Sequence, residues 1–584
     1  MKLSINGNPQ SIYNKVAWLL FWGTAFRFFL VLLAIFCLPL DQTLAMVHDD
    51  AYYYLDMARS LGQGHGAIYG GLLLTNGYQP LWQGVLTVVS WLLGNDREGL
   101  FRATLLLPLP LLLLGLLWLW HSSRHVGDDL AMPLVVGVLA VFITFQFSLG
   151  MGMETSLMLW LLPYLAYVLE RRVLTNGALL AFSLLPLIRL DALIVPVIHG
   201  VLLLWLARRH QQPVIWRHFA IFLLPLLVVV MYAIANQQYF GWPLPISGVV
   251  KSAGGAWFTN LPALWQGVTT PVLTGTLLLW LLMECLTRGL PKDARFFYVM
   301  TVLLLATLGQ SIYYGFFSTW PLWPWYTYLA ACFSAVAIAR MAYLVPVALS
   351  AKRWLPLSIG LGVLIFILAQ VPRTAATTNL LAWMRHQLFG VDVSQVFQVR
   401  LAHTATQIRT DVYPLLEGKT VAMGDRAGVM VYWRPEQARF IQTEGLMADM
   451  AYHQSRFAGR GEAYLVNHGV DLLITDRDYY AQEPMASGKV FVIPEPAMGA
   501  MTKRGAMLFC FPQDAVLREY SDVKGEIHTR LFDFHRRVPC SPDITQRYGE
   551  IERGELGYTK YIQPHLADGS WLDRLGRYGR TLQP

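Results

Sequence analysis

Long apolar runs alternate with short polar loops along the first two thirds of the chain. A transmembrane helix needs about 20 predominantly apolar residues. Eleven runs suit such a crossing, and they lie near residues 16–39, 101–120, 131–149, 155–169, 174–190, 192–207, 218–236, 271–287, 296–316, 325–345 and 354–371. A further run, Pro80–Gly94, is too short for a comfortable crossing. The pattern predicts a polytopic α-helical membrane protein.

The pattern changes in residues 372–584. Four short apolar segments that end in polar turns predict buried strands, at 419–425, 470–476, 489–494 and 506–511. This part contains 25 Lys/Arg and 24 Asp/Glu, an ordinary soluble balance, whereas the other 20 of the 45 basic residues and 13 of the 37 acidic residues belong to the first part. We therefore expect two domains, a membrane domain over 1–371 and an α/β domain over 372–584.

The positive charge of the first part indicates topology. If Pro80–Gly94 lies in the membrane surface or re-enters, all the cationic loops, such as "ARRHQQPVIWRH" and "SAKRW", fall on one side, which the positive-inside rule assigns to the cytoplasm. Eleven crossings then place the N-terminus in the cytoplasm and the α/β domain outside. A bacterial inner membrane with a periplasmic working face fits this arrangement, with membrane lipids as surroundings and no nucleic-acid partner.

The first outer loop, His48–Trp82, contains the densest candidate chemistry. Ala51, Leu55 and Ala58 recur at helical spacing up to Gly62, so a short amphipathic helix begins at the adjacent Asp49 and Asp50. Carboxylates are stabilised in the first turn of a helix, and one of the two could simply be an N-cap. Two adjacent acids at a membrane boundary favour a functional interpretation, in which one is catalytic and the other caps or orients.

Further candidates come from loops predicted on the same face. Within "TNGYQPLW", Asn76-Gly77 indicates a turn, Pro80 begins a helix, and the aromatic rings suit sugars or an interfacial anchor equally. Cys510 and Cys540 in the tail could pair in an oxidising compartment, and no His/Cys spacing indicates a metal site.

Several of these segments together resemble the GT-C superfamily of polyprenyl-phosphate-sugar glycosyltransferases. They are "DDAYYYLDMARSLGQGHG", "TNGYQPLW", "GMETSL", "LIRLDALIVP", "YFGWPLPISGVVKS", "PWYTY" and "GDRAGVMVYW…IQTEGLMAD". The arabinofuranosyltransferase-like branch is the most similar, and the protein O-mannosyltransferases and lipid A aminoarabinose transferases are more distant. The resemblance implies a GT-C-like membrane domain followed by the extracytoplasmic α/β domain. It also implies transfer of one sugar from a polyprenyl-phosphate donor to a glycan, lipid or protein acceptor.

The resemblance also implies roles for particular residues. Asp49 corresponds to the catalytic base, with Asp50 as the second choice, and Glu154 corresponds to a second outer acid. Lys251 corresponds to a partner of the donor phosphate. Many relatives have Asp-Glu where this chain has Asp-Asp, which leaves the sugar and the acceptor undetermined.

Each further candidate has a structural alternative. Lys251 is a phosphate ligand or an interfacial lysine. Arg189 contacts phosphate or forms a pair with Asp191 that holds a helix bend. Glu154 orients the acceptor, binds a divalent cation such as Mg²⁺ or Mn²⁺, or caps a helix. The aromatic and amide candidates for substrate contact are Tyr53, Asn76, Tyr78, Trp82 and Tyr326. A lipid-linked glycan polymerase or ligase and a transporter or flippase are the alternative functions, although no repeated halves favour a transporter.

Overall fold

The computed structural model describes residues 29–44, 46–94, 96–123, 152–171, 175–211, 213–251, 294–318, 375–392, 408–424, 427–476, 481–485, 488–495, 507–521 and 528–546, with a few single positions such as Tyr326 and Tyr328. The predicted crossings at 131–149, 271–287 and 354–371 lie outside these residues, as do parts of those at 16–39 and 325–345. The predicted number of eleven crossings therefore stays a prediction.

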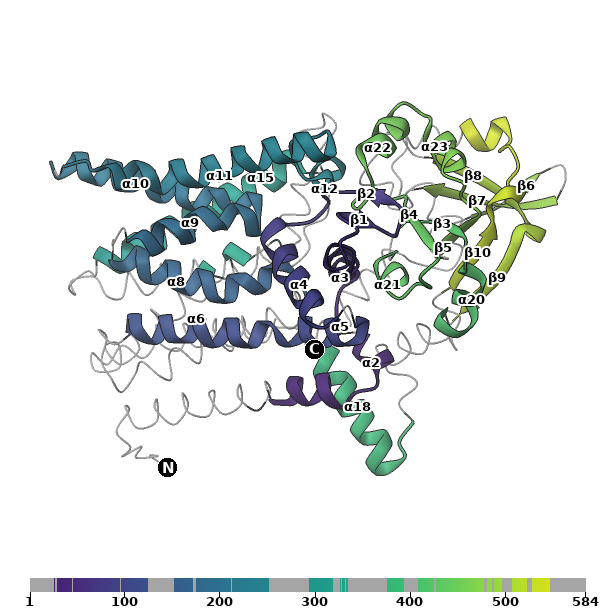
Figure 1. The fold of residues 1–584 in the computed structure, drawn as a ribbon, viewed down its shortest axis with the longest axis horizontal. Helices are drawn as coiled ribbons and strands as arrows, with labels where there is room; N and C mark the ends of the chain where they lie inside the picture. The colour runs from purple at the N-terminus through teal and green to yellow at the C-terminus, as the bar shows by residue number, and fades with distance from the viewer. Residues whose placement is uncertain are drawn as a thin grey trace, which may run out of the picture.

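Apolar helices form a bundle on one side of the molecule (Figure 1). They are α6 (Pro108–Ser123), α8 (Met158–Arg171), α9 (Asn176–Ile188), α10 (Ile194–Arg209), α11 (Trp216–Phe240) and α15 (Ala294–Phe317). Within the described part, three stretches are long and apolar enough to span a membrane, namely Leu190–Arg209, Trp216–Phe240 and Tyr298–Phe317. Helix α11 exposes Leu223, Leu227 and Met231, as a helix bordering lipid would.

One predicted crossing is divided between two helices, and whether it spans a membrane stays a prediction. The run at 101–120 is not a single helix, because α5 (Arg97–Leu106) ends before Leu107 and α6 begins at Pro108. Pro108 has no backbone N–H to donate to the preceding turn, which favours an interruption at this position. The Asp96 side chain caps the start of α5 by accepting from the amides of Glu98 and Gly99.

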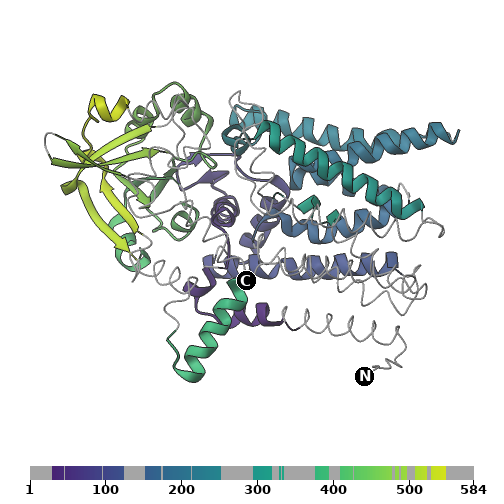
Figure 2. The ribbon, with the colours of Figure 1, turned by 180° about the vertical axis from the view of Figure 1, so that it is seen from behind.

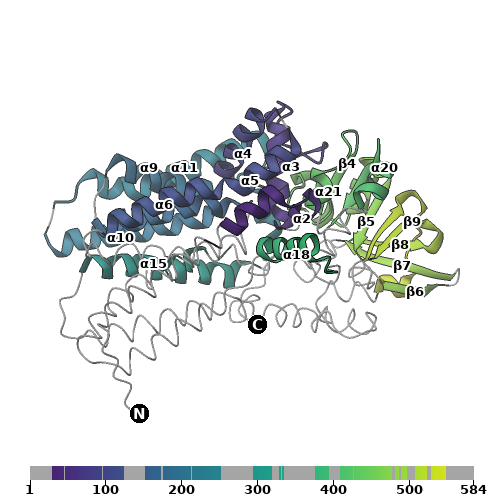
Figure 3. The same ribbon diagram turned by 90° about the horizontal axis from the view of Figure 1, so that it is seen from below.

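Short elements fill the space between the bundle and the tail (Figures 1 and 2). They are α2 (Leu40–Leu44), α3 (Asp49–Gly62), β1 (Ile68–Tyr69), β2 (Leu73–Leu74), α4 (Pro80–Leu92), α5, η1 (Glu154–Leu157), η2 (Leu190–Leu193) and α12 (Ile246–Lys251). The predictions of a helix ending at Gly62 and of a helix beginning at Pro80 are confirmed. Helix α18 (Ala375–Phe389) lies beside α2 (Figure 3).

The tail has a mixed α/β structure from residue 408 onward. Its elements are η4 (Ile408–Val412), α20 (Tyr413–Leu416), β3 (Thr420–Met423), α21 (Ala427–Tyr432), β4 (Arg439–Gln442), α22 (Met450–Phe457), α23 (Gly461–Asn467), β5 (Leu472–Asp476), β6 (Ala481–Met485), β7 (Gly488–Glu495), β8 (Met507–Pro512), η6 (Gln513–Ala515), β9 (Val516–Ser521), β10 (His528–Asp533) and η7 (Phe534–Arg536). Each of the four segments predicted as strands overlaps one, namely β3, β5, β7 and β8.

The tail strands form two sheets. One has the order β4-β3-β5-β10-β9, in which β3 is parallel to β4 and to β5, while β10 is antiparallel to β5 and to β9. The other is antiparallel, with the order β6-β7-β8. Because parallel strands bury both faces, every residue of β3 is buried.

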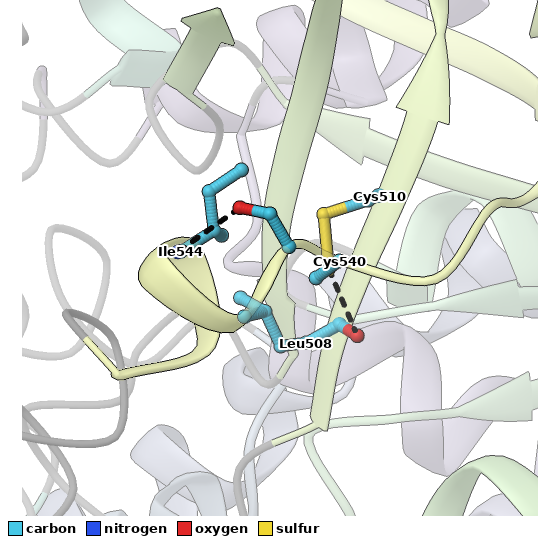
Figure 4. The surroundings of a disulfide bond; sticks show 5 residues. Leu508, Cys510, Cys540 and Ile544 are labelled. Atoms are coloured by element: carbon cyan, nitrogen blue, oxygen red, sulfur yellow. Dashed lines mark hydrogen bonds between the residues drawn. A yellow bond between two sulfur atoms is a disulfide. The ribbon is translucent and has the colours of Figure 1, made fainter. Parts of the chain in front are cut away.

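A disulfide joins two segments near the end of the described part of the tail. Cys510 in β8 is bonded to Cys540, 30 residues later, with a Cα–Cα distance of 5.3 Å (Figure 4). An isolated β-bridge between Cys510 and Val538 holds the two segments in register. The pairing that the sequence left conditional is thus present.

One apolar core is shared by the bundle, the short elements and the tail. It includes Leu55 of α3, Phe182 of α9, Val302 of α15, Val431 of α21 and Phe440 of β4. The division at residue 371 stays a prediction, but the described tail packs on α3 as part of the same core.

Candidate functional site

Helix α3 separates its two adjacent aspartates onto different sides. An α-helix turns by about 100° per residue, so residues four apart lie on the same face. Asp49 and Tyr53 contact the tail, whereas Tyr54, four residues after Asp50, contacts Glu154 at the start of η1. The helix therefore connects two different environments through neighbouring residues.

Asp49 binds the first turn of α21 in the tail. Its Oδ2 accepts a hydrogen bond from the Gly428 amide at 2.7 Å, and its Oδ1 accepts one from the Val429 amide at 2.9 Å. The approach requires a glycine, because a Cβ at position 428 would lie 2.3 Å from the Asp49 backbone oxygen. The residue at the N-cap of α3 is His48, whose side chain makes no capping bond. Asp49 thus caps a helix, but the helix lies in the tail, 379 residues away in sequence.

Two further contacts attach the tail to this side of α3. Gln442 Nε2 donates to the Tyr53 hydroxyl at 2.8 Å and to Glu444 Oε2 at 3.1 Å. Arg434 forms a buried ion pair with Asp56, which also accepts from the Gly70 amide at 2.9 Å.

Backbone contacts also join the segment after α3 to the tail. The Phe440 amide at the edge of the five-stranded sheet donates to the Gly70 carbonyl at 2.8 Å. Gly77, in the predicted Asn-Gly turn, lies against the loop that follows β4, since a Cβ there would be 2.1 Å from the Leu446 carbonyl oxygen. The first outer loop and the tail therefore form one packed surface.

The other side of α3, toward the helical bundle, faces a buried polar cluster centred on Arg189. The Tyr54 hydroxyl donates to Glu154 Oε2 at 2.9 Å, and Arg189 Nη1 donates to Glu154 Oε1. Arg189 Nε also pairs with Asp191 Oδ1 at 3.1 Å, and its Nη2 donates to the Tyr314 hydroxyl at 3.0 Å. The predicted Arg189–Asp191 pair is confirmed, and it lies where the chain leaves α9 and enters η2.

Lys251 brings a second cation to this cluster. Its Nζ donates to the Tyr326 hydroxyl at 2.6 Å, and the Arg189 guanidinium lies 4.8 Å from the centre of the same ring. Burial acts to lower the pKa of the Lys251 ammonium, but electrostatic interactions with Tyr326 and Asp50 raise the pKa above its ordinary value. The Asp50 carboxylate therefore favours the charged form of Lys251, and both residues are of intermediate exposure.

The candidates in the "TNGYQPLW" segment are mostly engaged in structure. Asn76 is buried; its Nδ2 donates to the Leu244 carbonyl at 3.1 Å, and its Oδ1 accepts from the Ile246 amide at 3.0 Å. It thereby fixes the start of α12, the helix that carries Lys251. Trp82 is fully buried and donates from Nε1 to the Gly152 carbonyl at 2.9 Å, while burial raises the pKa of Tyr78 to about 12.

Sequence reasoning missed several residues of the Arg189 cluster and of the contacts between α3 and the tail. Gln310 and Tyr314, one helical turn apart in α15, both donate to Asp191 Oδ2, at 2.7 and 2.8 Å. Two polar residues at this spacing in an apolar run were a usable signal, because polar groups in membrane helices face partners. Arg434 gave no such signal, since an arginine in a balanced soluble segment is ordinary.

The site can hold anions and move a proton, and no metal site is evident in the described part of the chain. Two cations, Lys251 and Arg189, share one aromatic ring, and the Asp50 carboxylate lies within electrostatic range of the first. No group of three or more His, Cys, Asp or Glu residues among those described could hold a metal ion. The predicted alternative of a divalent cation at Glu154 stays untested.

Comparisons with known proteins return remote structural similarity only. No family model and no curated protein matches the sequence. The chain is similar to the Archaeoglobus fulgidus oligosaccharyltransferase in complex with Zn and sulfate (13% identity, TM-score 0.39, 79% of this chain and 72% of that chain covered). It is also similar to ArnT from Cupriavidus metallidurans, both bound to undecaprenyl phosphate (12% identity, TM-score 0.37, 88% and 100% covered) and in the apo state (13% identity, TM-score 0.37, 89% and 100% covered). At these identities and TM-scores the similarity alone assigns no function, and the arabinofuranosyltransferase-like branch stays a prediction.

Proposed function

We propose that this protein is a membrane glycosyltransferase that moves one sugar from a polyprenyl-phosphate donor to an envelope glycan, lipid or protein. The observation that carries the proposal is the junction of α3, α12 and η2, where Lys251 Nζ donates to the Tyr326 hydroxyl and the Arg189 guanidinium lies over the same ring. The Asp50 carboxylate on α3 favours the charged form of Lys251. The junction lies at the end of the helical bundle, where a lipid-borne substrate and a water-borne acceptor can meet (Figure 1).

Asp50 is the general base of this proposal. In the transfer, the acceptor hydroxyl attacks the anomeric carbon, its proton passes to the carboxylate, and the bond from the anomeric carbon to the phosphate oxygen breaks. A positioned base contributes about 10²–10⁴ to such a rate. Asp49, the first choice from the sequence, is the weaker candidate, because both its oxygens already accept amide hydrogens from α21.

Lys251 is the proposed ligand of the leaving phosphate. Negative charge develops on the polyprenyl phosphate as the glycosidic bond breaks, and a fixed cation there stabilises the transition state. Arg189 has a supporting role, because its guanidinium lies over the ring of Tyr326, the residue that binds Lys251. Its own charge is already paired with Glu154 and Asp191. Asn76 and Tyr326 hold the lysine in place through α12 and through its Nζ.

The proposed location is a bacterial inner membrane with the tail in the periplasm. The distribution of cationic loops supports this orientation. The Cys510–Cys540 disulfide supports it independently, because structural disulfides persist in oxidising compartments and are rare in the cytosol.

The test separates the two aspartates with two measurements. In membranes that contain the native donor, Asp50→Asn is expected to lower the transfer rate by about 10²–10⁴, measured by mass spectrometry of prenyl-linked sugars and envelope glycans. Hydrogen exchange at the Gly428 and Val429 amides should not change in this variant. Wild-type transfer by Asp50→Asn refutes the assignment. Loss of transfer in Asp49→Asn with normal amide protection assigns the base to Asp49 instead.

The phosphate role of Lys251 is tested by donor affinity. Lys251→Gln should weaken binding of undecaprenyl phosphate at least about tenfold, which is the 1.4 kcal/mol of a modest charge-assisted contact. The exposed Lys419 of the tail offers a matched control, because Lys419→Gln makes the same change away from the site. Equal affinity in the two variants excludes the phosphate role.

A further inference from the structure

Helix α22 in the tail contains a fully buried arginine whose charge no described acidic side chain neutralises. Arg456 has no exposed surface. Its Nη1 donates to the Glu444 carbonyl at 3.2 Å and lies 3.5 Å from the Thr443 carbonyl, and its guanidinium lies 5.8 and 5.2 Å from the ring centres of Tyr452 and Phe457. Among the described residues it forms no ion pair.

One edge of this guanidinium has no hydrogen-bond partner. Nε and Nη2 are both buried and both unsatisfied within the described structure. Leaving buried N–H groups of a charged side chain without partners costs several kcal/mol, so such groups are normally paired. The Nε–Nη2 edge offers two parallel N–H donors, and this fork matches the two oxygens of a carboxylate or a phosphate.

We propose that Arg456 forms an oxyanion-binding site that takes a phosphate or a carboxylate group on its Nε–Nη2 edge. The surroundings suit this ligand better than bulk water, because the rings of Tyr452 and Phe457 lower the local dielectric and so strengthen a charge pair. The site is in the tail and is separate from the Lys251 junction, so it does not depend on the proposed transferase reaction.

The site is built around the loop that follows β4. Gly445 has a φ of 95°, and a Cβ there would lie 2.5 Å from His453 Cε1 and 3.5 Å from Arg456 Nη1. His453 Nε2 bonds with the Gly445 carbonyl at 2.9 Å, so two side chains of α22 hold three successive residues of this loop. The tight fit explains why a glycine is required at 445.

Occupancy of the site connects to α3 through the same loop. Glu444, whose carbonyl Arg456 holds, receives a hydrogen bond on its carboxylate from Gln442, and Gln442 also donates to Tyr53 of α3. An anion that neutralises Arg456 fixes the guanidinium and therefore the loop. Acidic groups on an acceptor or on a lipid are the sources that this chemistry admits.

Anion titration of the full-length protein in detergent tests the proposal. Isothermal titration with sodium phosphate and, separately, sodium glucuronate should show binding, with sodium chloride at equal ionic strength as the blank. Arg456→Lys keeps the charge without the fork, and Arg456→Met removes the charge, so both should bind at least tenfold more weakly. Arg439→Met, at an exposed arginine of β4, is the matched control and should bind as the wild type does.

Each outcome decides the matter. Binding of phosphate, of glucuronate or of both, lost in the Arg456 variants, supports the site, and binding of only one of the anions identifies the source. No response to either anion, or the same response in Arg456→Met, overturns it and leaves buried water as the partner. If Arg456→Met does not fold, a cryo-EM map of the wild type with phosphate replaces it. Density spanning Nε and Nη2 supports the site, whereas a single water peak refutes it.

Discussion

Replacing Asp49 by alanine should loosen the first turn of α21 from α3 while leaving the rest of the molecule folded. The substitution removes the acceptor of two amide hydrogen bonds, at 2.7 and 2.9 Å. A hydrogen bond to a charged group contributes about 1.5–3 kcal/mol. Because these two are only partly buried, water replaces part of what is lost, and we take the low end, a total of about 3 kcal/mol.

This loss should be measurable at two particular amides. Since 1.4 kcal/mol corresponds to a factor of ten, the exchange rates of the Gly428 and Val429 amides should rise by about 100-fold in native-state hydrogen exchange. Amides in β10, far from α3, should keep their protection and serve as the internal reference. Unchanged protection at Gly428 and Val429 in Asp49→Ala would show that Asp49 does not hold the tail, and the division of roles between the two aspartates would fail with it.

Three other predictions concern the tail and its attachment. Asp56→Asn breaks a buried ion pair with Arg434 and should lower the free energy of unfolding by about 3–5 kcal/mol, measured by chemical denaturation. His453 should make the tail acid-sensitive: burial, with the nearby Arg456 charge second, lowers its pKa from 6.5 to about 4 in the folded state. The unfolded chain then binds the extra proton, so stability is complete above about pH 6.5 and falls by on the order of 3 kcal/mol as the pH drops to about 4; His453→Gln should flatten this profile of melting temperature against pH. Replacing Cys510 and Cys540 by serine removes a crosslink over 30 residues and should cost roughly 3–4 kcal/mol, seen as a lower melting temperature that reductant no longer changes.

Each of these predictions has a control. Glu436→Gln alters an exposed carboxylate that pairs with Arg59 and Arg97, and it should cost no more than about 1 kcal/mol. A similar cost for Asp56→Asn would mean that its pair contributes little. A pH profile unchanged by His453→Gln would assign the acid sensitivity to another group. A reductant effect that persists in the double serine variant would exclude the disulfide as its origin.

The sequence predicted the elements well where local patterns decide them. The period of Ala51, Leu55 and Ala58 located α3, Pro80 located the start of α4, and runs of β-branched and apolar residues located β3 and β5. These features depend on neighbours along the chain, so they can be read without knowing the fold. The interruption at Pro108 was also readable, but the apolar character on both sides of it concealed the break.

The site was harder to predict, because its contacts join distant segments. The sequence separated a capping from a catalytic role for the two aspartates but placed the cap on their own helix. The actual partner amides belong to Gly428 and Val429, and no local pattern connects them to residue 49. Asn76 and Trp82 were candidates for substrate because amides and indoles suit sugars, yet both are buried in structural hydrogen bonds. Side-chain chemistry indicates what a residue can do, whereas burial decides whether a substrate can reach it.

Neighbouring residues of α3 contact different parts of the molecule, so the number of residues in this helix is tightly constrained. Insertion or deletion of one residue inside the helix turns every side chain on one side of the change by about 100° relative to the other. Tyr53 and Asp56 would then leave the tail, or Tyr54 would leave Glu154, even though every amino-acid type was preserved. Substitutions in α3 can be judged one contact at a time, but a change in its length uncouples the tail from the helical bundle in a single step.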